Sequence, residues 1–369
     1  MTVSTERLGN TRDFGAGIVD HDRDFRDYQV PNRYKMLDIA ARLLPDRPVS
    51  YCMKRAIPKK SIEVWKDNET GKAHLKGAMR CGSAWICPVC GSKIAVGRRV
   101  EIEEGIAKAK AKGFKMYLLT LTARHSRDDT LSDLMSNSKK ALRRMRQNRP
   151  WKRFSAKYGF QGHIDATEIT WGFSNGWHVH FHMIYLASEG IDTDQAENEI
   201  YDLWSKALAK VKMDCDRDHG VMVQPANEKA ASYMTKWGLS LEITSREKEG
   251  REGNYSPFQL LDLFDRGYKW AGYLFQEYAD ATKGLSSLRW SRGLRDDLGM
   301  GAAATDDELV EEILSEDSTK LLTLTAEQYK SLIYTGITGV IGKMLMVAER
   351  GKDALLLWLD YVGVDVEDT

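Results

Sequence analysis

Three histidines alternate along one short apolar stretch of the chain. Residues 176–184 read Gly-Trp-His-Val-His-Phe-His-Met-Ile, which places imidazoles at His178, His180 and His182. Because side chains alternate along a β-strand, these rings share one face and the apolar residues between them point to the other. The spacing is typical of metal ligands. A hydrated sheet face with ordinary histidines is the alternative, and three alternating imidazoles disfavour it.

A carboxylate is predicted to lie across from these histidines. Residues 161–171 form the pattern of a second strand, and residues 172–176 form a short turn that ends in Asn-Gly. Opposed residues in such a hairpin have Cβ atoms about 5 Å apart. The expected pairs are Trp171 with Trp177, Thr170 with His178, Glu168 with His180, and Ala166 with His182. We therefore expect a divalent cation, Mg or Mn, on His180, His182 and Glu168, with His178 as an additional candidate.

A tyrosine on a predicted helix offers a nucleophile. Asn227 is a suitable N-cap for a helix over residues 228–237. On that helix Lys229, Tyr233 and Lys236 share one face, so two ammonium groups flank a phenol. Such charges suit a phosphate and lower the phenol pKa from about 10. An amphipathic helix with a half-buried tyrosine is the alternative interpretation.

Four of the five cysteines lie within 39 residues of one another. Their spacing is C-x28-C-x5-C-x2-C, formed by Cys52, Cys81, Cys87 and Cys90. The C-P-V-C sequence is typical of a structural zinc site, and Cys52 is the most remote of the four expected ligands. Reduced, buried thiols are the alternative. Residues 1–10 are polar and no apolar stretch has transmembrane length, so we expect a cytoplasmic protein without membrane contact, whose thiols bind metal.

Basic residues are concentrated before the predicted hairpin. The chain has 54 lysines and arginines against 53 acids, a net charge of +1, so it is not generally polycationic. Residues 136–153 nevertheless carry eight cations and no acid, and we predict that they contact DNA phosphates. A solvated helix face is the alternative. The eight are Lys139, Lys140, Arg143, Arg144, Arg146, Arg149, Lys152 and Arg153.

The order of these elements predicts an α+β fold, with an antiparallel sheet and flanking helices. We expect an N-terminal cysteine-rich zinc-binding region over residues 1–113, with a helix near 94–112. A central region with the predicted hairpin and tyrosine helix follows over 114–244. A charged linker over 245–255 leads to a mostly helical C-terminal region over 245–369, where Thr305 begins a capping box and residues 355–362 pack internally.

The combination of motifs resembles the HUH endonucleases, in particular plasmid rolling-circle replication initiators. His180 and His182 match the family's histidine pair, residues 117–125 resemble its first motif, and residues 233–236 match the motif that carries the nucleophilic tyrosine. The likeness continues through residues 256–261 and 290–295. It therefore extends from about the first cysteine to the region before the acidic tail.

This resemblance implies nicking and joining of one DNA strand. Tyr233 would form a covalent 5′-phosphotyrosine and release a 3′ hydroxyl for a polymerase, while Lys236 would help to hold the phosphate. The implied partners are plasmid origin DNA, single-stranded at the nick, and a host helicase and polymerase. Some relatives carry a glutamate four residues before the tyrosine to activate water for strand release. Lys229 occupies that position here, so the sequence does not assign the termination step.

Three other functions fit parts of the pattern. A relaxase or transposase would use the same nicking chemistry. A non-catalytic zinc-containing regulator would bind DNA without cutting it. An iron oxygenase would use two histidines and one carboxylate, but it leaves the basic run and the lysine-flanked tyrosine without a role.

Overall fold

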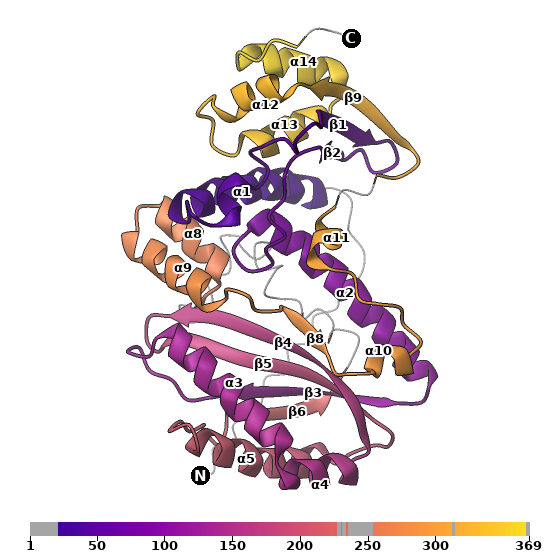
Figure 1. Ribbon diagram of the computed structural model, residues 1–369, viewed down its shortest axis with the longest axis vertical. Coiled ribbons are helices and arrows are strands. Elements are labelled where there is room, and N and C mark those ends of the chain that lie inside the picture. The colour runs from indigo at the N-terminus through magenta and orange to yellow at the C-terminus, as the bar shows by residue number, and fades with distance from the viewer. Residues whose placement is uncertain (1–20, 227–229, 231–233, 235–253, 312–313, 367–369) are drawn as a thin grey trace, which may run out of the picture.

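The computed structural model describes residues 21–226, 230, 234, 254–311 and 314–366. Two antiparallel sheets lie at different levels of an elongated molecule, with helices between and around them (Figure 1). The predicted α+β class is confirmed. The larger sheet has the order β6 (Val221–Pro225), β3 (Lys115–Thr122), β5 (Gly176–Ala187), β4 (Phe160–Gly172) and β7 (Asn254–Tyr255), and β8 (Leu288–Trp290) also pairs with β4. The smaller sheet has the order β2 (Ala73–Lys76), β1 (Ile62–Asp67) and β9 (Ser318–Leu324).

The hairpin forms in the predicted register. Trp171 lies opposite Trp177, Glu168 opposite His180, and Ala166 opposite His182. β3 pairs with the other edge of β5, so that Thr122 lies opposite His180 and Thr120 opposite His182. The alternation of side chains therefore gives the larger sheet one face with the histidines and one face with Phe181, Met183 and Tyr185. We call these the histidine face and the opposite face.

Helices cover both faces of the larger sheet. On the opposite face lie α3 (Leu131–Gln147), α4 (Arg149–Lys157) and α5 (Thr193–Ala209), whose apolar side chains join Phe181 and Met183 in one buried cluster. On the histidine face, a second buried cluster joins Ile184 and Leu118 of the sheet to Ile102 and Ile106 of α2 (Pro88–Ala111). The order of strand, basic helix and hairpin is as expected from the sequence.

The predicted helix near residues 94–112 begins earlier than expected. α2 starts at Pro88, a proline in the first turn, and the Sγ of its N-cap residue Cys87 accepts a hydrogen bond from the backbone N–H of Cys90. Proline suits this position because its fixed φ is helical and the missing N–H would have no helical partner. The cysteine motif therefore begins the helix and does not precede it.

The described part of the C-terminal region is mostly helical, as predicted, but it also supplies strands to both sheets. β7 and β8 pair with β4, and β9 pairs with β1. The end of the predicted linker, Asn254–Tyr255, is therefore a strand. The helices of this region are α8 (Pro257–Asp265), α9 (Lys269–Ala281), α10 (Leu294–Asp297), α11 (Asp306–Val310), α12 (Ala326–Ile333), α13 (Val340–Ala348) and α14 (Lys352–Tyr361). The capping box at Thr305 forms as predicted.

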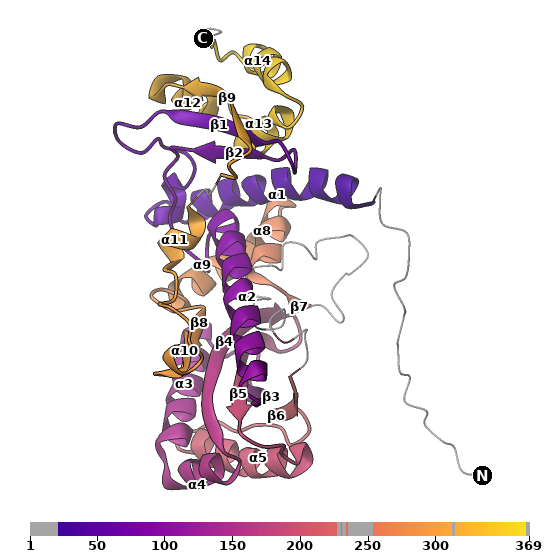
Figure 2. The same cartoon turned by 90° about the vertical axis from the view of Figure 1, so that its right-hand side faces the viewer.

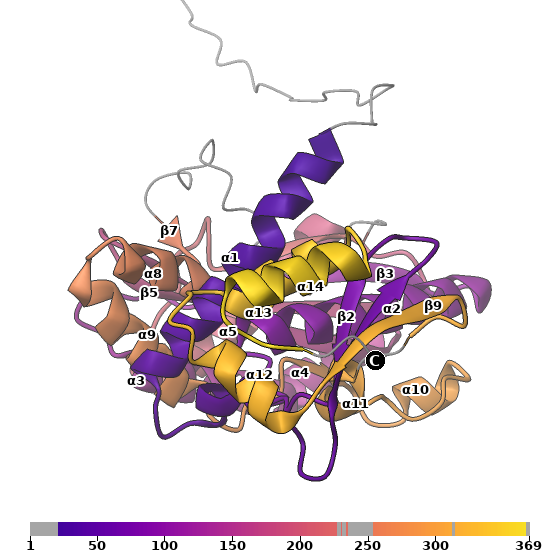
Figure 3. The ribbon, with the colours of Figure 1, turned by 90° about the horizontal axis from the view of Figure 1, so that it is seen from above.

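The first and last regions of the chain pack together. α1 (His21–Leu43) and the short 3-10 helix at Pro48–Tyr51 lie between the two sheets (Figure 2). α13 packs on α1, as the view from above shows (Figure 3). The predicted domain boundaries at residues 113 and 244 stay a prediction. However, β9 and α13 of the C-terminal region pack with residues 21–76 of the N-terminal region, through the pairing of β9 with β1 and the contact of α13 with α1. None of the helices within the described ranges is both long and apolar enough to cross a membrane.

One ion pair fastens α3 to the opposite face. Arg146 donates two hydrogen bonds to Asp165 of β4, at 2.6 and 2.7 Å, and a third to the hydroxyl of Tyr185 at 3.0 Å. Only 17% of the arginine side chain and 15% of the aspartate side chain are exposed. Burial alone would raise the pKa of Asp165, but the hydrogen bonds and charge of Arg146 outweigh it and hold the pKa below its ordinary value.

Replacing Arg146 with methionine should strongly destabilise the fold. The change leaves Asp165 as a buried charge without its partner, which costs about 3–5 kcal/mol in the free energy of unfolding. Arg143→Met, on the exposed side of the same helix, should change it by no more than about 0.5 kcal/mol. Urea denaturation at neutral pH measures both values. Because the folded pKa of Asp165 is lowered, the contribution of the pair is fully present above the unfolded carboxyl pKa of about 4 and is lost as the pH falls below that value towards the folded pKa. The difference in unfolding free energy between wild type and Arg146→Met should therefore narrow below about pH 4. Equal losses in both variants would contradict the assignment.

Candidate functional site

Threonines of β3 orient the two central histidines. The hydroxyl of Thr122 lies 2.9 Å from Nδ1 of His180, and that of Thr120 lies 3.1 Å from Nδ1 of His182. Each hydroxyl can accept a hydrogen bond from Nδ1–H, which fixes the ring and leaves Nε2 as the ligand atom. The sequence places these threonines within the first motif, but their role follows only from the pairing of β3 with β5.

Glu168 lies where the hairpin register predicts. Its Oε2 is 2.9 Å from Nε2 of His182, and 11% of the histidine side chain is exposed. Two cis ligands at about 2.1 Å from one octahedral ion lie about 3.0 Å apart, so this pair already has the separation that a small divalent cation needs. One nitrogen and one oxygen ligand suit Mg or Mn. The donor set therefore fits the predicted cation.

His180 lies next to His182 on the histidine face. Its ring centroid is 6.1 Å from that of His182, and the two rings are nearly parallel. In the part of the chain that the structure describes, only the four cysteines have every ligand atom within 4.8 Å of the others. A rotation of the His180 side chain is therefore needed to close the three predicted ligands on one ion.

His178 pairs with another histidine. Its ring centroid lies 4.2 Å from that of His125, whose Nδ1 is 3.0 Å from the carbonyl oxygen of Asn175 in the hairpin turn. Burial, with smaller contributions from His125 and His180, lowers the pKa of His178 to about 4. The ring is therefore neutral near pH 7, and its buried Nε2 has no hydrogen-bond partner among the described atoms. His125 lies in the first motif, residues 117–125, and its contact with His178 was not predicted from the sequence.

The predicted nucleophile lies outside the described residues, as do Lys229 and Lys236. Two residues close to Tyr233 in the sequence, Ala230 and Met234, are described and fully buried. Both belong to the cluster on the histidine face, with Ile184 of β5. Ala230 and Met234 therefore contact the same face of the sheet as the histidines.

The four cysteines of the predicted zinc site do meet. The sulfur of Cys52 lies 3.6 Å from those of Cys87 and Cys90, and the sulfur of Cys81 lies 3.8 Å from that of Cys90. Four sulfurs at about 2.3 Å from one tetrahedral zinc lie about 3.8 Å apart, which is close to these values and far from a disulfide. Hydrogen bonds, first from Cys52, hold the pKa of Cys90 well below its ordinary value and favour a thiolate. The cluster can hold a structural metal such as zinc.

The basic residues of the predicted DNA surface have different environments. Arg146 is committed to Asp165, and Arg144 donates to the backbone carbonyl of Lys210 at 3.0 Å. Trp151 and Phe154 of α4 are buried core residues, so they are not available to stack on unpaired bases. The other cations are exposed or half-buried on α3 and α4: Lys139, Lys140, Arg143, Arg149, Lys152 and Arg153.

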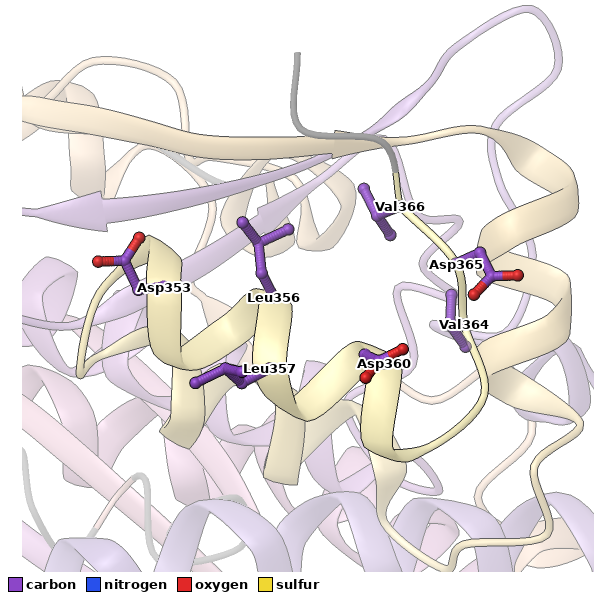
Figure 4. Close-up of a pocket in the computed structure, with 7 residues that line it drawn as sticks. All are labelled: Asp353, Leu356, Leu357, Asp360, Val364, Asp365 and Val366. Atoms are coloured by element: carbon purple, nitrogen blue, oxygen red, sulfur yellow. The ribbon is translucent and has the colours of Figure 1, made fainter.

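A pocket at α14 has the wrong charge for DNA. It measures about 590 Å³, and three carboxylates surround it, from Asp353, Asp360 and Asp365 (Figure 4). Leu357 on the same helix is 73% exposed, whereas Leu355 is buried, so only part of the predicted internal segment packs internally. The carboxylates repel phosphate, so this pocket is unsuited to DNA.

Comparisons with known proteins agree with the resemblance. Residues 72–238 match the family model described as a replication protein. A "Protein rep" of Streptomyces lividans is 28% identical over 319 residues, which cover 67% of this chain and 70% of that protein. A "Neomycin resistance protein" of Streptomyces cyanogenus is 32% identical over 154 residues, which cover 35% of each chain. No solved structure matches the chain significantly.

Loss of a threonine contact should weaken metal binding. Thr122→Val removes the hydroxyl that orients His180, and removing such a partner typically costs 10–100-fold in affinity, so we expect a drop of roughly that size for Mn²⁺. Isothermal titration with Mn²⁺ measures it. Thr167→Val, on the opposite face of the same sheet, is the matched control and should leave the affinity unchanged. Equal affinities for both variants would remove Thr122 from the site.

The cysteine cluster should bind zinc in a fixed ratio. Metal analysis of purified protein should find about one zinc per chain, since four sulfurs fill a tetrahedral shell. Cys87→Ser should lose this zinc and lower the melting temperature. Cys215→Ser, which changes a buried thiol remote from the cluster, should keep the zinc. Protein that is fully folded and contains no zinc would refute the site.

Proposed function

We propose that this chain is a plasmid replication initiator that acts by nicking and rejoining one strand of origin DNA. The match of residues 72–238 to the replication-protein family model and the likeness to a "Protein rep" support this proposal. The observation that carries this proposal is the histidine face. There Glu168 lies 2.9 Å from His182, and threonines of β3 orient both central rings. These groups suit a metal-assisted attack on a phosphodiester.

The proposed metal ligands are His180, His182 and Glu168, with His178 beside them. When bound there, a divalent cation supplies Lewis-acid polarisation of the scissile phosphate. Thr120 and Thr122 keep the rings oriented through Nδ1. The neutral His178 adds no positive charge to the ligand row.

Tyr233 is the proposed nucleophile. Its phenolic oxygen attacks phosphorus, the bond from phosphorus to the 3′ oxygen breaks, and the 5′ phosphate remains joined to the tyrosine. Lys236 holds the phosphate or the phenolate. The burial of Ala230 and Met234 on the histidine face supports this proposal, because these two neighbours of Tyr233 in the sequence lie on the same side of the sheet as the metal ligands. The retained phosphotyrosine lets a later hydroxyl attack and close the circle.

Binding of origin DNA is assigned to the exposed and half-buried cations of α3 and α4 whose side chains have no hydrogen-bond or ion-pair partner among the described residues. These are Lys139, Lys140, Arg143, Arg149, Lys152 and Arg153, while Arg144 and Arg146 have internal contacts. The scissile strand must be single at the nick to reach the histidine face. A host helicase and polymerase extend the released 3′ end in the cytoplasm, where the plasmid replicates. Zinc at the cysteine cluster is proposed as a structural ion.

Relaxases and transposases share this chemistry, and a zinc-containing regulator shares the cysteine cluster. The family match to a replication protein favours replication over the first two. The threonines fix the tautomers of His180 and His182 so that Nε2 can bind a metal. Histidines that only stabilise the sheet, as the regulator would have, do not need a fixed tautomer, so this arrangement favours catalysis.

Loss of the phenol should abolish the covalent adduct. Purified protein is incubated with Mn²⁺ and single strands that tile a candidate origin, and adducts are detected by denaturing gel and mass spectrometry. Tyr233→Phe should form no detectable adduct while its DNA affinity stays within about twofold of wild type. Tyr361→Phe, an exposed tyrosine of α14, is the control and should react normally. An adduct that persists in Tyr233→Phe would disprove the nucleophile.

The metal ligands are tested in the same assay. His182→Ala should lower Mn²⁺ affinity and reduce nicking by roughly 10²-fold or more, because the developing charge on the scissile phosphate loses its stabilisation. His74→Ala, in the smaller sheet, should have no effect on either quantity. Normal nicking by His182→Ala would remove the metal from the mechanism, and DNA binding without nicking by the wild type would favour the regulator.

A further inference from the structure

A cavity of about 730 Å³ lies on the opposite face of the larger sheet, behind the histidines. Phe181 and Met183 of β5 and Thr167 of β4 form its floor. α3 forms one wall, and residues 284–289, which lead into β8, form another. Figure 1 shows α3 lying across β4 and β5, with β8 near the same strands. Three segments that are distant in the sequence therefore build this cavity.

Positive charge dominates the lining of the cavity. Five cations line it, namely Lys139, Lys140, Arg143, Arg146 and Arg289, against the single acid Asp165. Asp165 is occupied by its bidentate pair with Arg146, which leaves four cations without a carboxylate in hydrogen-bond range among the described residues.

The charges repel one another as they stand. Burial, with a smaller contribution from the charge of Arg289, lowers the pKa of Lys139 to about 8. Cations held close together destabilise each other's charged forms, and this raises the free energy of the folded protein unless a bound anion neutralises them. Lys139 and Arg143 lie one turn apart on α3, about 5–6 Å along the helix, which allows contacts with phosphates one or two steps apart on a strand.

The sheet separates this cavity from the metal ligands. Phe181 and Met183 point into the cavity, whereas His180 and His182, which alternate with them, point away. A phosphate held by Lys139 and Arg289 therefore lies on the far side of β5 from the phosphate that is cut. Phosphates bound on the two faces would therefore belong to different stretches of DNA.

We propose that this cavity binds the phosphate backbone of an origin DNA segment other than the strand being cut, with Arg289 as a contact in addition to the cations of α3. The inference rests on the proposed function and adds a second, separate DNA contact to it. Lys140, Arg143 and Arg289 are exposed and stand on two different walls, which suits a strand that passes between them better than a compact free phosphate.

The test compares two DNA substrates. One is a duplex origin that includes the nick site, and the other is a short single strand that covers only the nick site. Lys139→Gln/Arg289→Gln should reduce the salt slope of duplex binding by about 1.8, that is about 0.9 for each lost phosphate contact, and weaken duplex binding at low salt at least tenfold. Adduct formation on the short strand is measured with Arg289→Gln alone and should stay within twofold of wild type.

The matched control removes two charges elsewhere. Lys330→Gln/Arg350→Gln changes two exposed cations of the C-terminal region, so both substrates should behave as with wild type. Arg289→Gln alone changes an exposed side chain and should lower the salt slope of duplex binding by about 0.9. If the double variant is less stable than wild type, this single variant provides the test.

Three results would overturn the inference. An unchanged salt slope for duplex DNA means that the cavity makes no DNA contact. A parallel loss of adduct on the short strand means that these cations hold the scissile strand. Competition of duplex binding by micromolar pyrophosphate or ATP, abolished by Arg289→Gln, means that a free phosphate is the ligand. If the wild type forms no adduct at all but the slopes differ as expected, the nicking proposal fails and the DNA contact stands.

Discussion

The alternation of side chains along β5 is the constraint on which both sides of the larger sheet depend. A strand presents neighbouring residues to opposite faces, so one stretch of sequence supplies His180 and His182 to one face and Phe181 and Met183 to the other. A slip of one residue would exchange these sets. The histidines would then enter the core under α3, and the apolar residues would replace the metal ligands. The register is therefore a condition of both function and stability.

Two devices fix that register. The short turn at residues 172–176 sets which residues of β4 and β5 face each other, and both were predictable because turn and alternation are local. The second device is the ion pair of Arg146 with Asp165, which ties α3 to one face only. Its partners are 19 residues apart. From the sequence Arg146 reads as one more cation of a DNA-binding run, and only the packing of α3 on β4 separates it from its exposed neighbours.

Features set by local sequence were predictable, whereas contacts between distant segments were not. Local patterns gave the hairpin, the capping box at Thr305 and the meeting of four cysteines, since spacing and side-chain type determine these. The contacts that join distant segments were not predictable: the threonines of β3 behind the histidines, Arg289 of β8 beside α3, and β9 in the smaller sheet. Each depends on strand order, which no single segment encodes.

The cysteine cluster and the histidine face are connected through one helix. Cys87 caps α2 and Cys90 lies in its first turn, so a metal held there fixes where the helix begins. The last turns of α2 carry Ile106 and Ala109 into the cluster that also contains Met234. A helix is stiff over this length, so fixing one end restrains the other. The cysteines therefore support the face on which the histidines lie, although the sequence alone presents them as a separate N-terminal unit.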